Sequence, residues 1–98
     1  MNNLLASIVN RVYAEQQQEQ EFIIKIKKNC KRLVENMLEA ADINKDNMRE
    51  GFYIELMKHL KMTWDLIDNV NCKEEAIEAK ETTINFWDAL EAVGLVGL

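Results

Sequence analysis

Residues 22–38 of this chain read FIIKIKKNCKRLVENML and form its longest run of apolar residues at helical spacing. The positions that recur at intervals of three and four residues are Ile23, Ile26, Cys30, Leu33 and Met37. A strand would need strict alternation of apolar and polar residues, which this stretch lacks. The stretch therefore predicts an amphipathic helix that buries one face in a core.

The same segment holds the densest positive charge of the chain. Its cations are Lys25, Lys27, Lys28, Lys31 and Arg32. One interpretation is that they are solvated flanks whose aliphatic stems cover the edge of the core. The other is that they form a binding surface for phosphate or another anion. The pattern alone leaves both open.

Composition sets the fold class. The chain has 98 residues, which predicts a single domain over residues 1–98, and 48% of them are hydrophobic, which is enough to build a core. It contains no proline and three glycines, so it lacks the turn residues that a protein of short strands needs. We expect an all-α protein.

Two polar segments divide the rest of the chain, DINKDN at residues 42–47 and NVN at residues 69–71. Short connections between long helices predict antiparallel neighbours. We therefore expect an antiparallel helical hairpin of about residues 22–41 and 48–70, with flanking N- and C-terminal helices in a small bundle. Gly51 indicates either a late start of the second hairpin helix or a close approach by another backbone.

The two ends of the chain are apolar and predict self-association. A short amphipathic stripe precedes the polar run EQQQEQE at residues 15–21, where the helix either continues or bends. The tail after Gly94 is also apolar. The residues that we expect at an interface between subunits are Leu4, Leu5, Ile8, Val12, Leu95, Val96 and Leu98. Burying them predicts a homo-oligomer, a dimer or higher.

Several classes of function are disfavoured. The net charge of −5 argues against binding to duplex nucleic acid, which needs an excess of cations. Cys30 and Cys72 are too few for a disulfide scaffold or a zinc site, which favours a reducing cytosol. The N-terminus has no basic region before its apolar residues, so we expect neither a signal peptide nor a membrane partner, and a cytoplasmic location.

The residue patterns that catalysis or metal binding would need are also missing. Residues 42–53 begin like a calcium-binding loop, but Tyr53 stands where a bidentate glutamate is required. His59 is the only histidine, so a repeated di-iron motif is absent, and we expect it to be a half-buried helix residue. There is no nucleophile elbow or phosphate-binding loop. We predict a protein that is not an enzyme and that has no metal or cofactor.

One aromatic residue stands apart from the predicted core. Tyr13 lies at the end of the N-terminal stripe, and it either packs at the edge of a bundle or stacks on a nucleobase. With Tyr13 upstream, IKKNCKRL at residues 26–33 resembles a helix of the small helical-hairpin phage proteins that sequester cyclic oligonucleotide signals of the CBASS defence system. The resemblance covers about half of the chain. It implies a homo-oligomer without catalysis that binds a cyclic nucleotide between subunits, through Tyr13, Lys27, Lys28 and Lys31.

Two hypotheses follow. The first is a small binding protein, an inhibitor from a phage or another mobile element that covers a host defence protein in the host cytoplasm as a helical homo-oligomer. The alternative is the cyclic-oligonucleotide sponge. The position of Tyr13 relative to Lys27, Lys28 and Lys31 distinguishes them, because the sponge requires these side chains to converge on one pocket.

Overall fold

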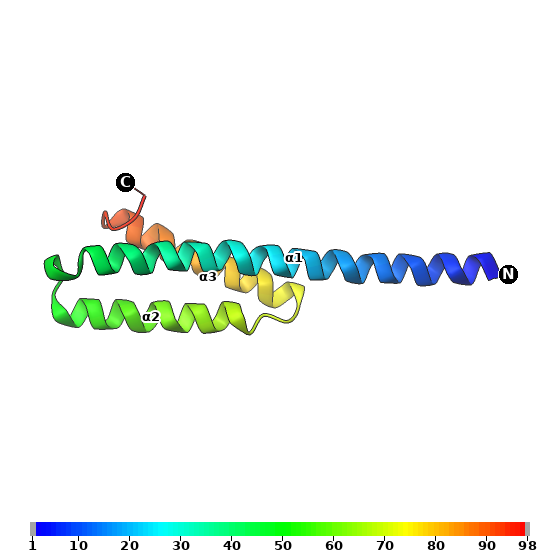
Figure 1. Cartoon of the computed structure of the whole chain (residues 1–98), viewed down its shortest axis with the longest axis horizontal. Coiled ribbons are helices and arrows are strands. Elements are labelled where there is room, and N and C mark those ends of the chain that lie inside the picture. The colour runs from blue at the N-terminus through cyan, green and yellow to red at the C-terminus, as the bar shows by residue number, and fades with distance from the viewer. Residues whose placement is uncertain (1, 98) are drawn as a thin grey trace.

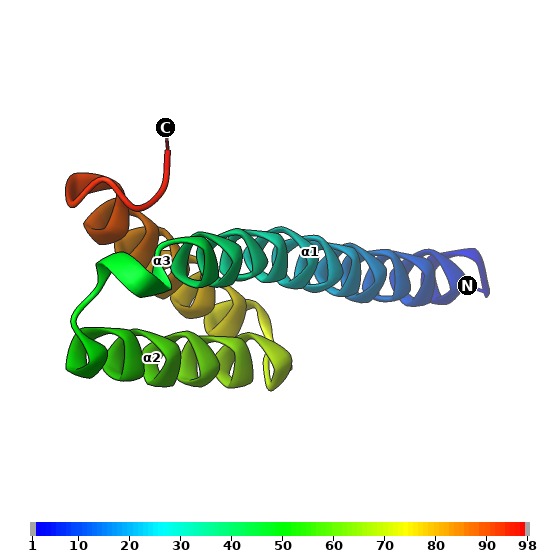
Figure 2. The ribbon, with the colours of Figure 1, turned by 60° about the vertical axis from the view of Figure 1, so that its left-hand side comes forward.

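The computed structural model describes the backbone of residues 2–97 and the side chains of residues 4–97. It contains three α-helices, α1 (Asn2–Ile43), α2 (Glu50–Asp68) and α3 (Lys73–Ala92), and a short 3-10 helix η1 (Lys45–Asn47). No strand occurs in the described part, so the all-α class is confirmed. α1 and α2 form the predicted antiparallel hairpin, and α3 crosses both (Figures 1 and 2).

The flanking N-terminal helix is not a separate element. α1 runs without interruption through the polar run of residues 15–21, so the open question of a bend is settled in favour of continuity. Glutamate and glutamine are strong helix formers, and the segment contains no glycine or proline that would break it. At 1.5 Å per residue, the 42 residues of α1 make a rod about 63 Å long.

α2 covers only one half of this rod, and α3 crosses the same half (Figure 1). The molecule measures 70 × 23 × 16 Å, and its radius of gyration of 18.8 Å exceeds the ~13 Å of a compact chain of this length. We call residues 2–21 of α1 the arm, and residues 22–97 the body. Beyond its base, where α3 begins, the arm projects from the body without a neighbouring element in either view (Figures 1 and 2).

The core lies where the three helices of the body meet. The largest fully buried side chains are Met37, Leu60, Ile67, Val34 and Thr83. The buried face of α3 is made mostly of small residues, since Ala76, Ala79 and Thr83 are fully buried, and Leu90 is buried near its end. The Thr83 hydroxyl donates to the carbonyl oxygen of Ala79 at 2.7 Å, so its burial leaves no unpaired polar group.

The α1–α2 connection differs from the sequence-based expectation in its details. α2 begins at Glu50 and not at Met48, and its first residue is not capped by a side chain. Gly51 is exposed, and a Cβ atom built on it would meet nothing within 4 Å. Of the two explanations for Gly51, the late start of the helix is therefore confirmed and the close approach of a second backbone is wrong.

Candidate interaction surfaces

The arm has no apolar partner within the subunit. Every side chain from residue 4 to residue 21 is exposed. The large apolar ones and their exposed fractions are Leu4 71%, Leu5 68%, Ile8 50%, Val9 60%, Val12 47% and Tyr13 63%. The arm touches the body at its base, where the backbone N–H of Lys73 donates to Glu19 Oε1 at 3.3 Å. The predicted stripe therefore exists as an exposed helical face.

This exposed face continues the buried face of the same helix. Ile8 and Ile26 are 18 residues apart, as are Val12 and Cys30, and 18 residues make about five complete turns. Each pair therefore points in the same direction from the axis of α1. Ile26 is 8% exposed and Cys30 is 3% exposed, whereas the arm residues of the two pairs keep about half of their surface.

The apolar tail behaves differently from the arm. α3 ends in a Schellman-type turn, because Gly94 N donates to the Glu91 carbonyl at 3.0 Å and Leu95 N donates to the Leu90 carbonyl at 2.9 Å. Gly94 adopts the left-handed conformation that this turn requires, with φ of 79°.

This turn directs the tail back to the body. Val96 is only 6% exposed and Leu95 is half-buried against the core. Val96, which we expected at an interface between subunits, is therefore buried within its own subunit. Leu98, the last residue of the predicted interface, lies outside the described residues.

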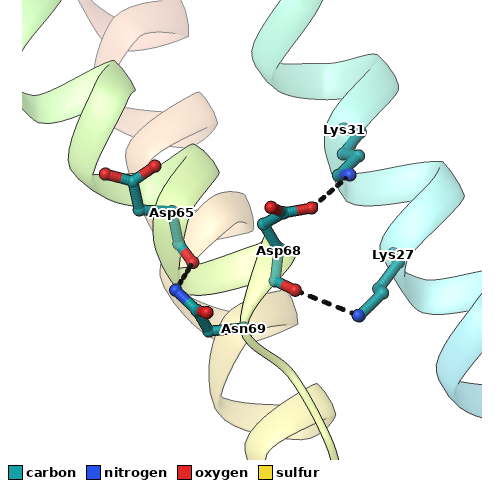
Figure 3. Close-up of polar contacts among 5 residues, drawn as sticks. All are labelled: Lys27, Lys31, Asp65, Asp68 and Asn69. Carbon is teal, nitrogen blue, oxygen red and sulfur yellow. Dashed lines mark hydrogen bonds and ion pairs between the residues drawn. The ribbon is translucent and has the colours of Figure 1, made fainter.

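Two of the predicted ligand-binding lysines converge on the end of α2 (Figure 3). Lys31 Nζ lies 2.7 Å from Asp68 Oδ1, and Lys27 Nζ donates to the carbonyl oxygen of Asp68 at 3.1 Å. The hydrogen bond and the charge of Lys31 lower the pKa of the Asp68 carboxyl group. Lys31 also lies 4.9 Å from the ring centroid of Trp64. These lysines thus tie the two hairpin helices together.

The other two residues of the predicted site do not join this cluster within one subunit. Lys28 is exposed and lies about 100° around α1 from Lys27, at the helical pitch. Tyr13 shares the direction of Lys31 but stands 18 residues away, roughly 27 Å along the helix. Tyr13 can therefore approach Lys27 and Lys31 only from a different subunit.

A groove between α1 and α2 was not predicted. It encloses about 610 Å³ and is lined by Leu38, Met57, Lys58, Leu60, Lys61, Trp64 and Asp65. Its lining is mostly apolar, and two lysines and one aspartate also contribute to it. The sequence contained a signal, because Met57, Leu60 and Trp64 recur at intervals of three and four residues in the second hairpin helix.

A smaller pocket of about 260 Å³ lies between α1 and α3, and Cys30 is one of its lining residues. Burial raises the pKa of the Cys30 thiol, so this cysteine acts as a small apolar residue, as expected from its place on the stripe.

His59, expected to be half-buried, is exposed, and its Nε2 atom lies 3.9 Å from Glu55 Oε2. No helix among the described residues combines the length and apolar character needed to cross a bilayer.

Family models, curated proteins and solved structures were compared with the chain, and none matches it. Function is therefore inferred from the surfaces described above.

Proposed function

We propose that this protein works by binding other protein chains, without catalysis, and that it self-associates through its arm. The observation that carries the proposal is the exposed apolar face of the arm, which includes Ile8 and Val12. An apolar patch of this kind on a soluble protein marks a site of interaction.

The stability of the arm supports the same conclusion. The arm extends a helix that is already nucleated in the body, so only its intrinsic helix propensity holds it, and propensity supplies little free energy per residue. The polar run attaches the arm to the body, but it adds no apolar contact along residues 4–21. Burying the stripe against another chain stabilises the arm by ~25 cal/mol per Å² of apolar surface removed from water.

Light scattering with a concentration series tests this proposal. We expect wild-type protein to have a mass above that of a monomer at micromolar concentrations. The double variant Ile8→Asp, Val12→Asp is expected to be monomeric with an unchanged body, because charged groups cannot enter an apolar contact without a large cost.

The matched control is the double variant Ser7→Asp, Ala14→Asp, which adds the same charge to the opposite face of the arm. It is expected to associate like the wild type. A wild-type protein that is monomeric over the whole range would contradict the proposal.

The target of the assembled protein stays a prediction. A host protein of a defence system, bound by an inhibitor from a phage or another mobile element, is the target that we propose from the sequence analysis. The α1/α2 groove supports a protein ligand, because a mostly apolar lining with a few charged side chains suits the face of an amphipathic helix.

One observation favours the alternative, the cyclic-oligonucleotide sponge. Lys27 and Lys31 already hold two oxygen atoms of Asp68, at 3.1 and 2.7 Å, so their ammonium groups are arranged to bind oxygen. A phosphate would have to displace Asp68 to use them. Calorimetric titration of cyclic di- and trinucleotides into wild-type protein and a Lys27→Ala, Lys31→Ala variant tests this alternative, which predicts binding only by the wild type.

A further inference from the structure

We infer that the partner of the arm is the arm of a second copy, and that the two arms pair antiparallel. In this register Leu5 of one arm lies against the partner's Val12, and Ile8 lies against the partner's Val9. The inference rests on the proposed self-association and specifies its partner, direction and register.

Charge on the apolar face decides the direction. Glu15 and Glu19 lie on the same side of α1 as Ile8 and Val12, because their spacings of three, four and seven residues return to one face. A parallel pair in register would place each glutamate against its own copy. Like charges that face one another across a helix pair disfavour that arrangement.

Reversing one arm removes this conflict. When the two-fold axis passes between residues 8 and 9, residue 8 faces the partner's residue 9 and residue 5 faces the partner's residue 12. The numbers of any two facing residues add up to 17. Glu15 and Glu19 then lie outside the stretch of residues 4–13 that faces the partner's residues 4–13, so neither glutamate faces its own copy. Both carboxylates stay in water, and Arg11 faces the partner's Ala6 and not a second arginine.

The same register places the exposed apolar residues against one another. The residues of each arm that the pair covers are Leu4, Leu5, Ile8, Val9, Val12 and Tyr13. The base of the body limits the overlap, because α3 begins beside Glu19, where Lys73 N contacts its carboxylate. An overlap of residues 2–15 ends before that point. Such an interface is at the small end of specific contacts, so we expect a reversible dimer.

The arrangement gives the dimer two distant binding surfaces. The bodies lie at opposite ends of the paired arms, and each carries its own α1/α2 groove. Leu38 is about 30 residues from the centre of the pair, which places the two grooves roughly 90 Å apart along the axis. Two linked sites strengthen binding to a target that presents two copies of a ligand.

Disulfide cross-linking tests direction and register. The background variant is Cys72→Ser, which leaves only the buried Cys30. Leu5→Cys and Val12→Cys are made on separate chains in this background and oxidised alone and as an equimolar mixture. In the antiparallel register, cysteines at the same position are seven residues, or about 10 Å, apart along the axis, too far for a disulfide.

We therefore expect cross-linked dimer in the mixture and little in either chain alone. The control is Ser7→Cys, on the opposite face, which is expected to give no cross-link in any sample. Efficient cross-linking of Leu5→Cys with itself would overturn the antiparallel pairing, and so would the absence of cross-links in every sample.

A second measurement does not depend on cysteine. Sedimentation equilibrium compares the wild type with a Glu15→Gln, Glu19→Gln variant. Antiparallel arms predict a change in dissociation constant of less than about threefold, since neither glutamate faces a carboxylate. A parallel pair predicts tighter association by roughly tenfold or more, which would overturn the inference. A monomeric wild type removes the proposed function itself, whereas a dimer with the opposite charge response removes only this pairing.

Discussion

The two halves of α1 share one helix and one apolar direction, but only one half has a partner in the subunit. Residues 22–43 bury their stripe under α2 and α3, whereas the arm exposes the continuation of that stripe to solvent. Val34 and Met37 are fully buried, and Leu4 and Leu5 keep more than two thirds of their surface. Periodicity therefore predicts the direction of a face, and tertiary structure decides whether that face is a core or an interface.

The largest expected effect comes from one substitution at equivalent places in the two halves. Ile26→Asp puts a carboxylate in the core and should cost about 3–5 kcal/mol of folding free energy, because a charged group is removed from water there. Ile8→Asp, five turns earlier on the same face, should leave the unfolding free energy of the body unchanged. Urea denaturation at a concentration where the protein is monomeric measures both. Equal losses would show that the arm folds against the body.

The sequence predicted the hairpin because Ile26, Met37 and Leu60 are large apolar residues at helical spacing, and such residues are usually buried. The face of α3 was predicted only in part. Helical spacing predicts a last stripe of Ala76, Ile77, Ile84, Trp87, Leu90 and Val93, and of these Ala76 and Leu90 are buried, whereas Ile77 and Ile84 are 41% and 39% exposed. Close packing of α3 on two helices selects the small side chains of the neighbouring face, and hydrophobicity alone does not reveal that choice.

The candidate surfaces divide in a similar way. The arm stripe and the exposed Tyr13 follow from local spacing and could be predicted. The contacts of Lys27 and Lys31 with Asp68 join residues 41 and 37 positions apart, so they depend on the register between α1 and α2. Whether α1 bends between its halves stayed open because helix propensity favours continuity, but the polar run has no apolar stripe that would confirm it.

A substitution of intermediate effect sharpens the contrast between the arm and the tail. Gly94→Ala should destabilise the body by ~1–2 kcal/mol, because an alanine at φ of 79° is strained, and should free Val96 from the core. Gly51→Ala is the matched control, since its Cβ would enter open space on a helix, and it should stabilise the body by ~0.5–1 kcal/mol. Denaturant unfolding measures both variants.

Light scattering distinguishes the roles of the two chain ends in these variants. Neither glycine lies in the arm, so both variants are expected to associate like the wild type. A monomeric Gly94→Ala protein would place the tail in the subunit interface after all.

The smallest expected effect is the response of Asp68 to pH. Its pKa is lowered by Lys31, so the contact contributes stability at pH values above the ordinary carboxyl pKa of about 3.9 and loses it as the pH falls through the lower, folded value. In Lys31→Ala the pKa of Asp68 should rise towards its ordinary value, as a carbon-detected NMR titration would measure. An unchanged midpoint would show that the pair does not form in solution.

Association through the arm should not depend on pH between pH 5 and pH 8, which is above the range in which Asp68 titrates. Arg11 is the one ionisable side chain of residues 4–12, and the proposed pairing places Glu15 and Glu19 outside the apolar contact. The dissociation constant of the dimer is therefore expected to be constant over this range.

Because the backbone of α1 is helical through residues 15–21, this polar run fixes both the distance between the arm and the body and the direction in which the arm's apolar stripe points. Each residue of a continuous helix turns the arm by about 100° and advances it by 1.5 Å relative to the body. The side chains of the run are all exposed, so the identity of its residues other than Glu15 and Glu19 is weakly constrained. Their number is not, because one inserted residue would point the whole stripe away from the direction that the body faces. We therefore expect evolution to tolerate substitutions in this segment and to remove insertions and deletions.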